Sequence, residues 1–427
     1  MKLLIRRGHI VDPDTGLDGR YDILVDGETI SRIARFIEEP CDLLIDAEGM
    51  YVFPGFIDMH VHAREPGFSY KETFETVGKA AAKGGVTTIC AMPNTNPVID
   101  NAGLMRKVMA ETLEKCKVHF LQIGAMTLGQ KGEEIADIEG MVSEGCVALS
   151  EDGKSVPNAA LTFEIMKKAN RLGIPILDHC EDKSLAAGGV MNADANAEKF
   201  GLSGIPNVAE DVIAARDILL AADCGAHLHL CHCSTRGSVR LVELAKAQNF
   251  SVSAEVCPHH FILSSDDISE DDGRYKMNPP LRSAEDVERL RRGLRNGTIE
   301  VIATDHAPHS TTEKNCSMKE AAFGVVGLET LACLTYHYLV RGGVLSIMQM
   351  AEKLSTNPAR ILGLMDRGSL FKGKMADLTI FDPSRKVTID PDKFLSKGKS
   401  TPFEGMTVSG EVMYTIVAGK LAYEADK

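Results

Sequence analysis

The chain has 427 residues, 44% of them hydrophobic, and a formal net charge of −13 from 47 basic and 60 acidic residues. This charge argues against nucleic acid or an anionic membrane as the main partner, since both need basic patches. The N-terminal stretch MKLLIRRGHIVDP lacks the apolar core of a signal peptide, and no apolar run approaches the roughly 18 residues of a membrane span. We therefore expect a cytoplasmic protein whose eleven scattered cysteines are reduced thiols.

The two ends of the chain share one pattern. Residues 1–53 contain LLIRRGHIVD, DILVDGETISRIA and LLIDAEGMYVFPG, which predict short strands separated by Gly and Asp turns. Residues 365–427 contain ADLTIFDP, RKVTID and VMYTIVAGKLAYE, with the same features. We expect the two ends to pair into one small composite β-sandwich.

The centre, residues 54–364, alternates short apolar runs with amphipathic segments, several of which end in Gly as helices often do. Eight such units are typical of a (β/α)₈ TIM-type barrel, although a doubly wound open sheet uses the same alternation. The expected strands are 56–62, 86–92, 118–125, 146–150, 174–179, 226–232, 251–256 and 299–305.

Polar side chains stand at the C-terminal ends of nearly all these strands. Chemistry in a barrel takes place at that end, in the loops that follow the strands. A single histidine there is more often a hydrogen-bonded core residue than a ligand, but a chance scatter would also place such residues at strand starts and on helices. The strand-end residues are His60, His62, Arg64, Asn94, Glu151, Asp152, His179, His232, His259, His260 and Asp305.

The first strand carries the motif FIDMHVHAREPG, residues 56–67. Alternate side chains of a strand face one way, so His60, His62 and Arg64 would point together if the strand continued that far. Four histidines and two aspartates in the whole set are too many ligands for one tetrahedral zinc, but they suit two metals that share a carboxylate and a hydroxide. Zinc is favoured, although manganese or cobalt would also accept these ligands. Cys231 and Cys233 flank His232 and are expected to be buried free thiols.

Several longer segments give a more specific signal. PGFIDMHVHAREPG, AMPNTNP, LDHCED, HLHLCHCSTRGS, EVCPHHF, YKMNPPLR, ATDHAPH and FGVVGLET resemble the amidohydrolase superfamily, in particular its dihydroorotases of the longer bacterial type. The resemblance spans essentially the whole chain. It implies a binuclear zinc enzyme that catalyses the reversible cyclisation of N-carbamoyl-L-aspartate to dihydroorotate in pyrimidine synthesis.

The resemblance also implies roles for individual residues. His60 and His62 would bind one metal, His179 and His232 the other, and Asp305 would bind the first metal and act as the general acid/base. The substrate carboxylate would be held by Arg64, Asn94 and His309, and the pyrimidine ring would contact Asn278 and the backbone around Phe323 and Gly324.

One position separates subfamilies. Many members of the superfamily bridge their metals with a carbamylated lysine at the end of strand four, where this chain reads CVALSEDG. Asp152 is therefore the expected bridge, with Glu151 as the alternative ligand, while Lys154 stands too far into the loop.

Other functions agree less well with the sequence. A hydantoinase or allantoinase usually carries the bridging lysine and needs no clamp for a carboxylate. A non-catalytic scaffold would have lost metal ligands, and a zinc deaminase would need a helix-borne glutamate. Relatives form dimers and some associate with aspartate carbamoyltransferase, so a homodimer is expected and association with that enzyme is an open alternative.

Overall fold

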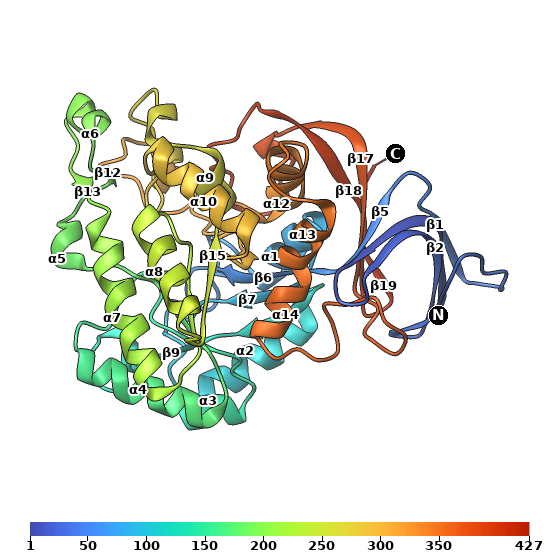
Figure 1. The fold of residues 1–427 in the computed structure, drawn as a ribbon, viewed down its shortest axis with the longest axis horizontal. Coiled ribbons are helices and arrows are strands. Elements are labelled where there is room, and N and C mark those ends of the chain that lie inside the picture. Colours follow the sequence, from blue (N-terminus) through green and yellow to red (C-terminus); the bar gives the residue numbers. More distant parts are fainter. Residues whose placement is uncertain (427) are drawn as a thin grey trace.

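The terminal segments meet in one mixed sheet of eight strands, seen on the right of Figure 1. The computed structural model describes residues 1–426. The strand order is β19-β18-β17-β5-β1-β2-β3, with β4 paired to β1. N- and C-terminal parts join where β17 runs antiparallel to β5. The strands are β1 (Lys2–Asp12), β2 (Leu17–Asp26), β3 (Thr29–Ala34), β4 (Leu43–Asp46), β5 (Tyr51–Pro54), β17 (Leu378–Thr388), β18 (Thr407–Val417) and β19 (Lys420–Glu424).

Strand β1 organises this sheet. Its first half pairs with β4 and its second half with β5, and its pairing with β2 shifts register between Ile5 and Gly8. Arg7, inside that irregularity, has a φ of 60°, a left-handed conformation typical of a bulge or turn. Apolar residues of both chain ends, such as Ile23 and Ile380, share one buried cluster, so both ends contribute to the same core.

The central strands are all parallel and form two sheets, β6-β7-β8 and β9-β10-β11-β14-β15-β16. Each lies within an expected range, but the third expected strand is broken at Ile123 into β8 and β9. An isolated parallel bridge joins Val61, at the end of β6, to His306, just beyond β16. The strands are β6 (Phe56–Val61), β7 (Val86–Ala91), β8 (His119–Gln122), β9 (Gly124–Ala125), β10 (Leu149–Ser150), β11 (Ile176–Asp178), β14 (Leu228–Leu230), β15 (Val252–Val256) and β16 (Val301–Ile302).

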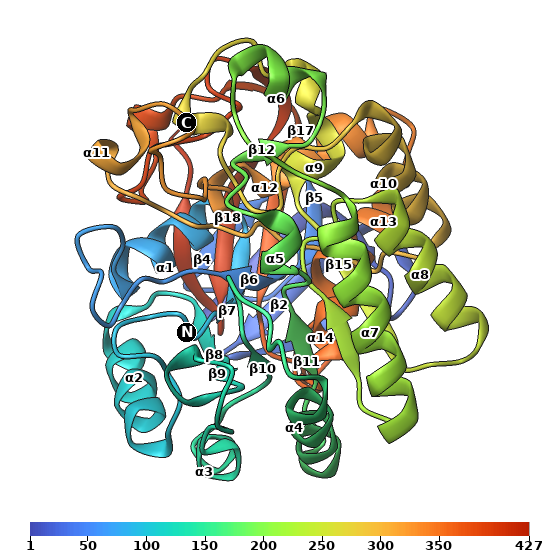
Figure 2. The same ribbon diagram turned by 90° about the vertical axis from the view of Figure 1, so that its left-hand side faces the viewer.

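Helices surround these strands, as Figure 2 shows. Their apolar faces pack outside the strands in one large cluster, while a second cluster, including Ile57, Met59 and Leu177, fills the space inside them. The longer helices are α1 (Phe74–Lys83), α2 (Ala102–Lys115), α4 (Ala159–Leu172), α7 (Val208–Cys224), α8 (Arg236–Ala247) and α10 (Ala284–Asn296). Short ones are α3 (Ile138–Ser143), α5 (Lys183–Ala186), α6 (Ala195–Phe200), α9 (Pro258–Ile262), α11 (Thr311–Lys314), α12 (Leu331–Thr335), α13 (Ile347–Ala351) and α14 (Asn357–Ile361). The small strands β12 (Met191–Asn192) and β13 (Gly204–Ile205) pair with each other.

Local sequence sets the helix boundaries. Helix α1 begins after Thr73, whose hydroxyl accepts the Thr76 amide in a capping box. Helix α4 ends at Gly173, which has a φ of 69°, a conformation that glycine adopts without steric cost. Among residues 1–426, none of the helices combines the length and the apolar character needed to cross a bilayer.

Candidate functional site

The C-terminal ends of the central strands bring the predicted site residues together. His60 lies on β6, and the other predicted ligands follow β6, β10, β11, β14 and β16 directly. All predicted ligands and substrate contacts except the fully buried His60 line one cavity of about 200 Å³. Its lining consists of His62, Arg64, Asn94, Asp152, Gly153, His179, His232, Asn278, Asp305, Ala307, His309, Phe323 and Gly324.

One half of the cluster is built around His60 and His62. His60 Nε2 lies 3.3 Å from Asp152 Oδ1 and 3.5 Å from Asp305 Oδ1. His62 Nε2 lies 3.4 Å from Asp152 Oδ2 and 3.1 Å from Asp305 Oδ1. Two imidazole nitrogens thus face two carboxylates. Strand β6 ends at Val61, so His62 and Arg64 reach the cavity from the loop rather than from one continuous strand face.

The other half contains His179 and His232. His179 Nδ1 and His232 Nε2 are 2.9 Å apart, and each lies 3.8 Å from Asp152 Oδ1. Asp152 therefore contacts all four histidines and stands between the two halves. This is the position that a carboxylate shared by two cations requires.

The unsatisfied atoms of the cluster fit a bound cation. His60 Nε2 is buried and has no hydrogen-bond partner, although it faces two carboxylates. Neutral imidazole nitrogen and carboxylate oxygen are the donors that zinc prefers, and buried polar atoms are normally paired. His60, His62 and Asp305 offer donor atoms within 4.8 Å of one another, and so do His60, Asp152 and His232.

Charge in the cluster is strongly coupled. Burial alone would raise the pKa of Asp152, but His60, His232 and His62 outweigh it and hold that pKa well below its usual value. The same balance lowers the pKa of Asp305, where burial is opposed by His60 and His62. Both carboxylates are consequently anionic near neutral pH and available to a cation.

The neighbours of Asp152 point elsewhere. Glu151 is buried, but its carboxylate accepts the amides of Met126 and Thr127, both at 3.1 Å, together with the Thr127 hydroxyl. Lys154 Nζ donates to the Gln130 carbonyl at 2.8 Å. Of the three residues, only Asp152 faces the histidines, which supports it over Glu151 as the bridging ligand.

A basic group lies on one wall of the cavity. Arg64 Nε donates to the Pro308 carbonyl at 3.0 Å, and its Nη2 lies 3.2 Å from His309 Nε2. Burial lowers the pKa of Arg64 to about 10, which still leaves the guanidinium charged at neutral pH. Burial, then Arg64 and Lys71, lowers the pKa of His309 to about 3, so this imidazole is neutral.

Asn94 contacts two of the predicted metal ligands. Its Oδ1 lies 2.9 Å from His62 Nδ1, and its Nδ2 donates to Asp152 Oδ2 at 3.0 Å. The amide therefore orients both residues while it lines the cavity.

The cavity lining also includes Asn278, Phe323 and Gly324. Asn278 Nδ2 donates to Glu181 Oε1 at 3.0 Å, and the Phe323 carbonyl lies 2.8 Å from His309 Nε2. Gly324 has a φ of 131°, and a Cβ there would meet the Ala307 oxygen at 2.6 Å. A side chain at this position would clash with Ala307 unless the backbone moved.

Backbone conformation is unusual at three of these residues. Arg64, His232 and Asp305 have φ values of 64°, 31° and 48°. Left-handed conformations are unfavourable for residues with a side chain and persist where the surrounding structure imposes them, often at functional sites.

Two groups of residues near these strand ends do not line the cavity. His259 and His260 follow strand β15 but do not line the cavity; they lie buried on α9, where His260 Nε2 contacts the Pro279 carbonyl at 2.9 Å. The cysteines of the described chain are free, and Cys231 and Cys233 are buried as predicted. Cys231 nevertheless offers its sulfur within 4.8 Å of His60 and Glu255 donor atoms.

Sequence reasoning missed two partners of the site. Glu255 is fully buried on β15 and contacts His60 Nδ1 at 2.8 Å. Its signal was one acidic residue in the otherwise uncharged run SVSAEV. Lys71 was also missed: its Nζ lies 3.1 Å from His309 Nδ1 and 2.7 Å from Glu313 Oε1.

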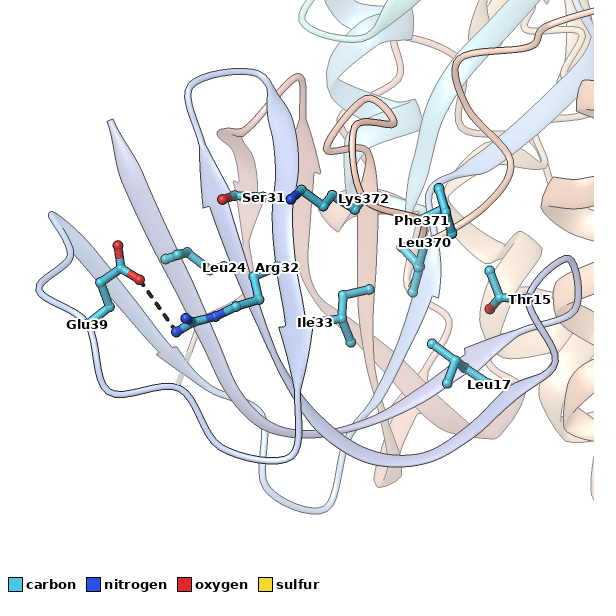
Figure 3. Close-up of a pocket in the computed structure, with 10 residues that line it drawn as sticks. All are labelled: Thr15, Leu17, Leu24, Ser31, Arg32, Ile33, Glu39, Leu370, Phe371 and Lys372. Carbon is cyan, nitrogen blue, oxygen red and sulfur yellow. Dashed lines mark ion pairs between the residues drawn. The ribbon is translucent and has the colours of Figure 1, made fainter.

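A larger cavity, of about 560 Å³, lies in the terminal sheet (Figure 3). Its lining is mostly apolar or uncharged, and its acidic residue, Glu39, is 3.5 Å from Arg32 in an ion pair. It offers no converging metal-type ligands, so size does not identify the active cavity of this protein.

Known proteins resemble the chain along its whole length. A family model described as dihydro-orotase-like matches residues 49–238. Dihydroorotase of Pelotomaculum thermopropionicum is 46% identical over 424 residues, with 99% of each chain covered. Dihydroorotase of Bacillus subtilis is 45% identical at the same coverage.

Solved structures give the same fold. L-hydantoinase (dihydropyrimidinase) from Arthrobacter aurescens superposes with a TM-score of 0.90 at 28% identity, covering 100% of this chain and 96% of that one. Dihydropyrimidinase from Brevibacillus agri gives 0.86 at 26% identity, covering 99% and 95%. The α/β architecture is thus that of metal-dependent cyclic amidohydrolases, and the full-length similarity is to dihydroorotases. The chain belongs to the dihydroorotase family.

Proposed function

We propose that this chain catalyses the reversible cyclisation of N-carbamoyl-L-aspartate to (S)-dihydroorotate and water, in the de novo synthesis of pyrimidine nucleotides (UMP). The observation that carries this proposal is one small cavity in which a buried histidine and aspartate cluster lies beside Arg64 and His309. A cyclic amide that bears a carboxylate needs both features. The dihydroorotases named above, similar over the whole chain, support the choice of substrate.

The donor set suits two zinc ions. His60, His62 and Asp305 would hold one and His179 and His232 the other, with Asp152 between them, because Asp152 contacts all four histidines. When bound, two such ions would lower the pKa of a water and polarise the amide carbonyl of the ring.

Asp305 is assigned as the general acid/base. Its buried carboxylate lines the cavity, and its lowered pKa leaves it unprotonated at the start of hydrolysis. Its Oδ atoms would accept the proton of the attacking water and pass it to the departing ring nitrogen. In ring closure the protonated carboxyl would return that proton to the oxygen that leaves as water.

Substrate recognition is assigned to two groups of cavity-lining residues. The charged guanidinium of Arg64, with the Asn94 amide and the His309 imidazole, would bind the carboxylate, because planar cationic donors match carboxylate geometry. Asn278 and the backbone at Phe323 and Gly324, which also line the cavity, would contact the ring.

The finer description of the fold is also a proposal. The bridge from Val61 to His306 supports closure of the central strands into a (β/α)₈ barrel over residues 54–364. The shared core of the terminal strands supports a β-sandwich formed by residues 1–53 and 365–427. A cytoplasmic homodimer, with aspartate carbamoyltransferase as a possible partner, is proposed from the family alone.

A hydantoinase-type activity is the competing function, since the solved structures described above are hydantoinases and dihydropyrimidinases. The presence of Asp152, with no lysine among the cavity-lining residues, favours the dihydroorotase. A non-catalytic scaffold is disfavoured because the histidine and aspartate set is complete.

Turnover of dihydroorotate, dihydrouracil and allantoin, measured with the metal content of the same sample, tests the proposal. We expect turnover of dihydroorotate and about two metals per chain. Arg64→Met should raise the KM for dihydroorotate without creating activity on the neutral rings. Efficient turnover of dihydrouracil with none of dihydroorotate would contradict the assignment.

A further inference from the structure

Glu255 occupies a position that the proposed reaction does not use directly. Its carboxylate is fully buried at the end of β15 and does not line the substrate cavity. One oxygen, Oε1, contacts His60 Nδ1 at 2.8 Å and accepts the His232 amide at 3.2 Å. Glu255 therefore contacts the ring of one proposed ligand, His60, and the backbone of another, His232.

The second carboxylate oxygen begins a column of hydrogen bonds. Glu255 Oε2 lies 3.1 Å from His229 Nε2, and His229 Nδ1 lies 2.8 Å from Ser253 Oγ. The same hydroxyl oxygen is 2.9 Å from His227 Nε2, and His227 Nδ1 is 2.9 Å from Ser251 Oγ.

The column follows from the two-residue repeat of a strand. His227 directly precedes β14 and His229 lies on it, while Ser251 directly precedes β15 and Ser253 and Glu255 lie on it. Residues two apart face the same way, so each set shares one face of its strand. The neighbouring residues Leu228, Leu230, Ala254 and Val256 belong to the outer apolar cluster, which places the column on the inner side. It runs from buried Glu255 to exposed Ser251.

With neutral histidine rings, each hydrogen bond of the column has one assignment of donor and acceptor. His60 Nε2 faces Asp152 and Asp305, so a metal there needs its lone pair, and the ring proton must be on Nδ1. His60 then donates to Glu255 from one side and His229 Nε2–H donates from the other. Ser253 donates to His229 Nδ1 and accepts from His227 Nε2–H, and Ser251 donates to His227 Nδ1. Burial, then His229, lowers the pKa of His227 to about 4, consistent with this neutral form.

We propose that Glu255 is a positioning residue that fixes the ring and tautomer of His60 for metal binding, and that the column from His229 to Ser251 holds Glu255 in place. The inference rests on the proposed metal centre, because it concerns how one of its ligands is presented. A carboxylate that accepts the second ring N–H of a histidine ligand raises the basicity of that ligand and restricts its rotation.

Cobalt binding to the metal-depleted full-length protein tests this, with the visible cobalt spectrum and the dissociation constant as readouts. Glu255→Gln removes the charge and places an amide against His229 Nε2–H. We expect an altered cobalt spectrum and a dissociation constant about 10- to 100-fold higher. His229→Leu, which keeps Glu255 but removes its support, should cause a smaller increase in the same direction, and it decides the matter if Glu255→Gln does not fold.

The matched control is Glu210→Gln. Glu210 is also buried, but it accepts the amides of Ser234 at 3.0 Å and Thr235 at 3.3 Å instead of bonding a histidine. This variant should lose thermal stability while the cobalt spectrum of the folded protein stays unchanged. A spectrum that shifts equally in Glu210→Gln would reduce Glu255 to a general structural role and overturn the inference.

Two further outcomes distinguish a failure of the role proposed for Glu255 from a failure of the proposed metal centre. Folded Glu255→Gln and His229→Leu with the parent spectrum and affinity would overturn the inference while the metal centre stands. A parent protein that binds no cobalt or zinc would overturn the proposed function too. Cys231→Ser should leave the spectrum unchanged; a shift as large as that of Glu255→Gln would mean that the thiol acts on His60 instead.

Discussion

The C-terminal ends of the central strands and the terminal sheet bury opposite kinds of side chain. At the ends of the central strands, four histidines and two carboxylates are buried within a few ångströms of one another, and His60 Nε2 has no hydrogen-bond partner. The terminal sheet buries an almost wholly aliphatic cluster that includes Leu3, Ile23 and Ile380. Burying charge is costly unless it is compensated, whereas burying apolar surface is favourable. Ligand-binding capacity is thus concentrated in a region that gains little stability from its own contacts, beside a region that gains much.

The largest expected effect is that of metal removal. A chelator should abolish turnover, and added zinc should restore it. Because a ligand present at 100 times its dissociation constant stabilises the folded state by about 2.7 kcal/mol, the melting temperature should also fall. Hydrogen exchange should rise in the loops after β6, β10 and β14 and stay unchanged in β1 and β17. Equal loss of protection in both regions would contradict the contrast.

Asp305→Asn should have the next largest effect. The amide cannot shuttle a proton between water and the ring nitrogen, so kcat should fall roughly 10²- to 10⁴-fold. Because Asp305 is also a proposed metal ligand, metal content is measured on the same sample and kcat is compared per bound metal. Asp266→Asn, at an exposed aspartate, is the control. Near-normal kcat with both metals bound would remove Asp305 from its proposed role.

Lys71→Met tests a more distant contact. Lys71 donates to His309 Nδ1, which leaves the Nε2 proton of His309 to donate to the Phe323 carbonyl 2.8 Å away, so these two contacts hold the ring beside Arg64. Loss of the Lys71 contact frees the ring to turn and should raise the KM for dihydroorotate about tenfold, roughly one lost hydrogen bond to a charged group, with little change in kcat. Lys79→Met removes an exposed lysine paired with Glu75 and should leave the KM unchanged.

Ile380→Ala should have the smallest effect on turnover. Ile380 is fully buried on β17, and truncation of such a side chain costs about 2–5 kcal/mol of the free energy of unfolding. Urea denaturation should detect this loss while kcat/KM of the folded protein stays unchanged. A matching fall in kcat/KM would show that the terminal sheet controls the shape of the cavity at the ends of the central strands.

Much of this molecule could be predicted from sequence because nearly every strand of the centre combines a short apolar run with a polar residue at its end. His60, His179, His232 and Asp305 were found in that way, and the structure brings them together. The choice between Glu151 and Asp152 could not be predicted from periodicity, because both follow the end of β10 and Glu151 is turned away by Thr127, 24 positions earlier in the chain.

Partners that act through another residue were also beyond sequence reasoning. Glu255 is separated from His60 by 195 positions, and one acidic residue in a strand does not reveal which side chain it contacts. Lys71 and Glu313 stand in no pattern that marks a site in the sequence, yet they form an ion pair beside His309. Resemblance to a family identifies residues within shared motifs, and tertiary contacts identify the residues that support them.

The pairing of β5 with β17 has a consequence for synthesis on the ribosome. Strands β1 to β5 are complete once Pro54 has been made, but their antiparallel neighbour begins at Leu378. At roughly 5–20 residues per second, the N-terminal strands wait tens of seconds with one edge unpaired and their aliphatic side chains uncovered. Unpaired edges recruit other strands. Nascent chains that stall before Leu378 should therefore be the aggregation-prone species of this protein, and chaperones should engage residues 1–54 for as long as that partner is missing.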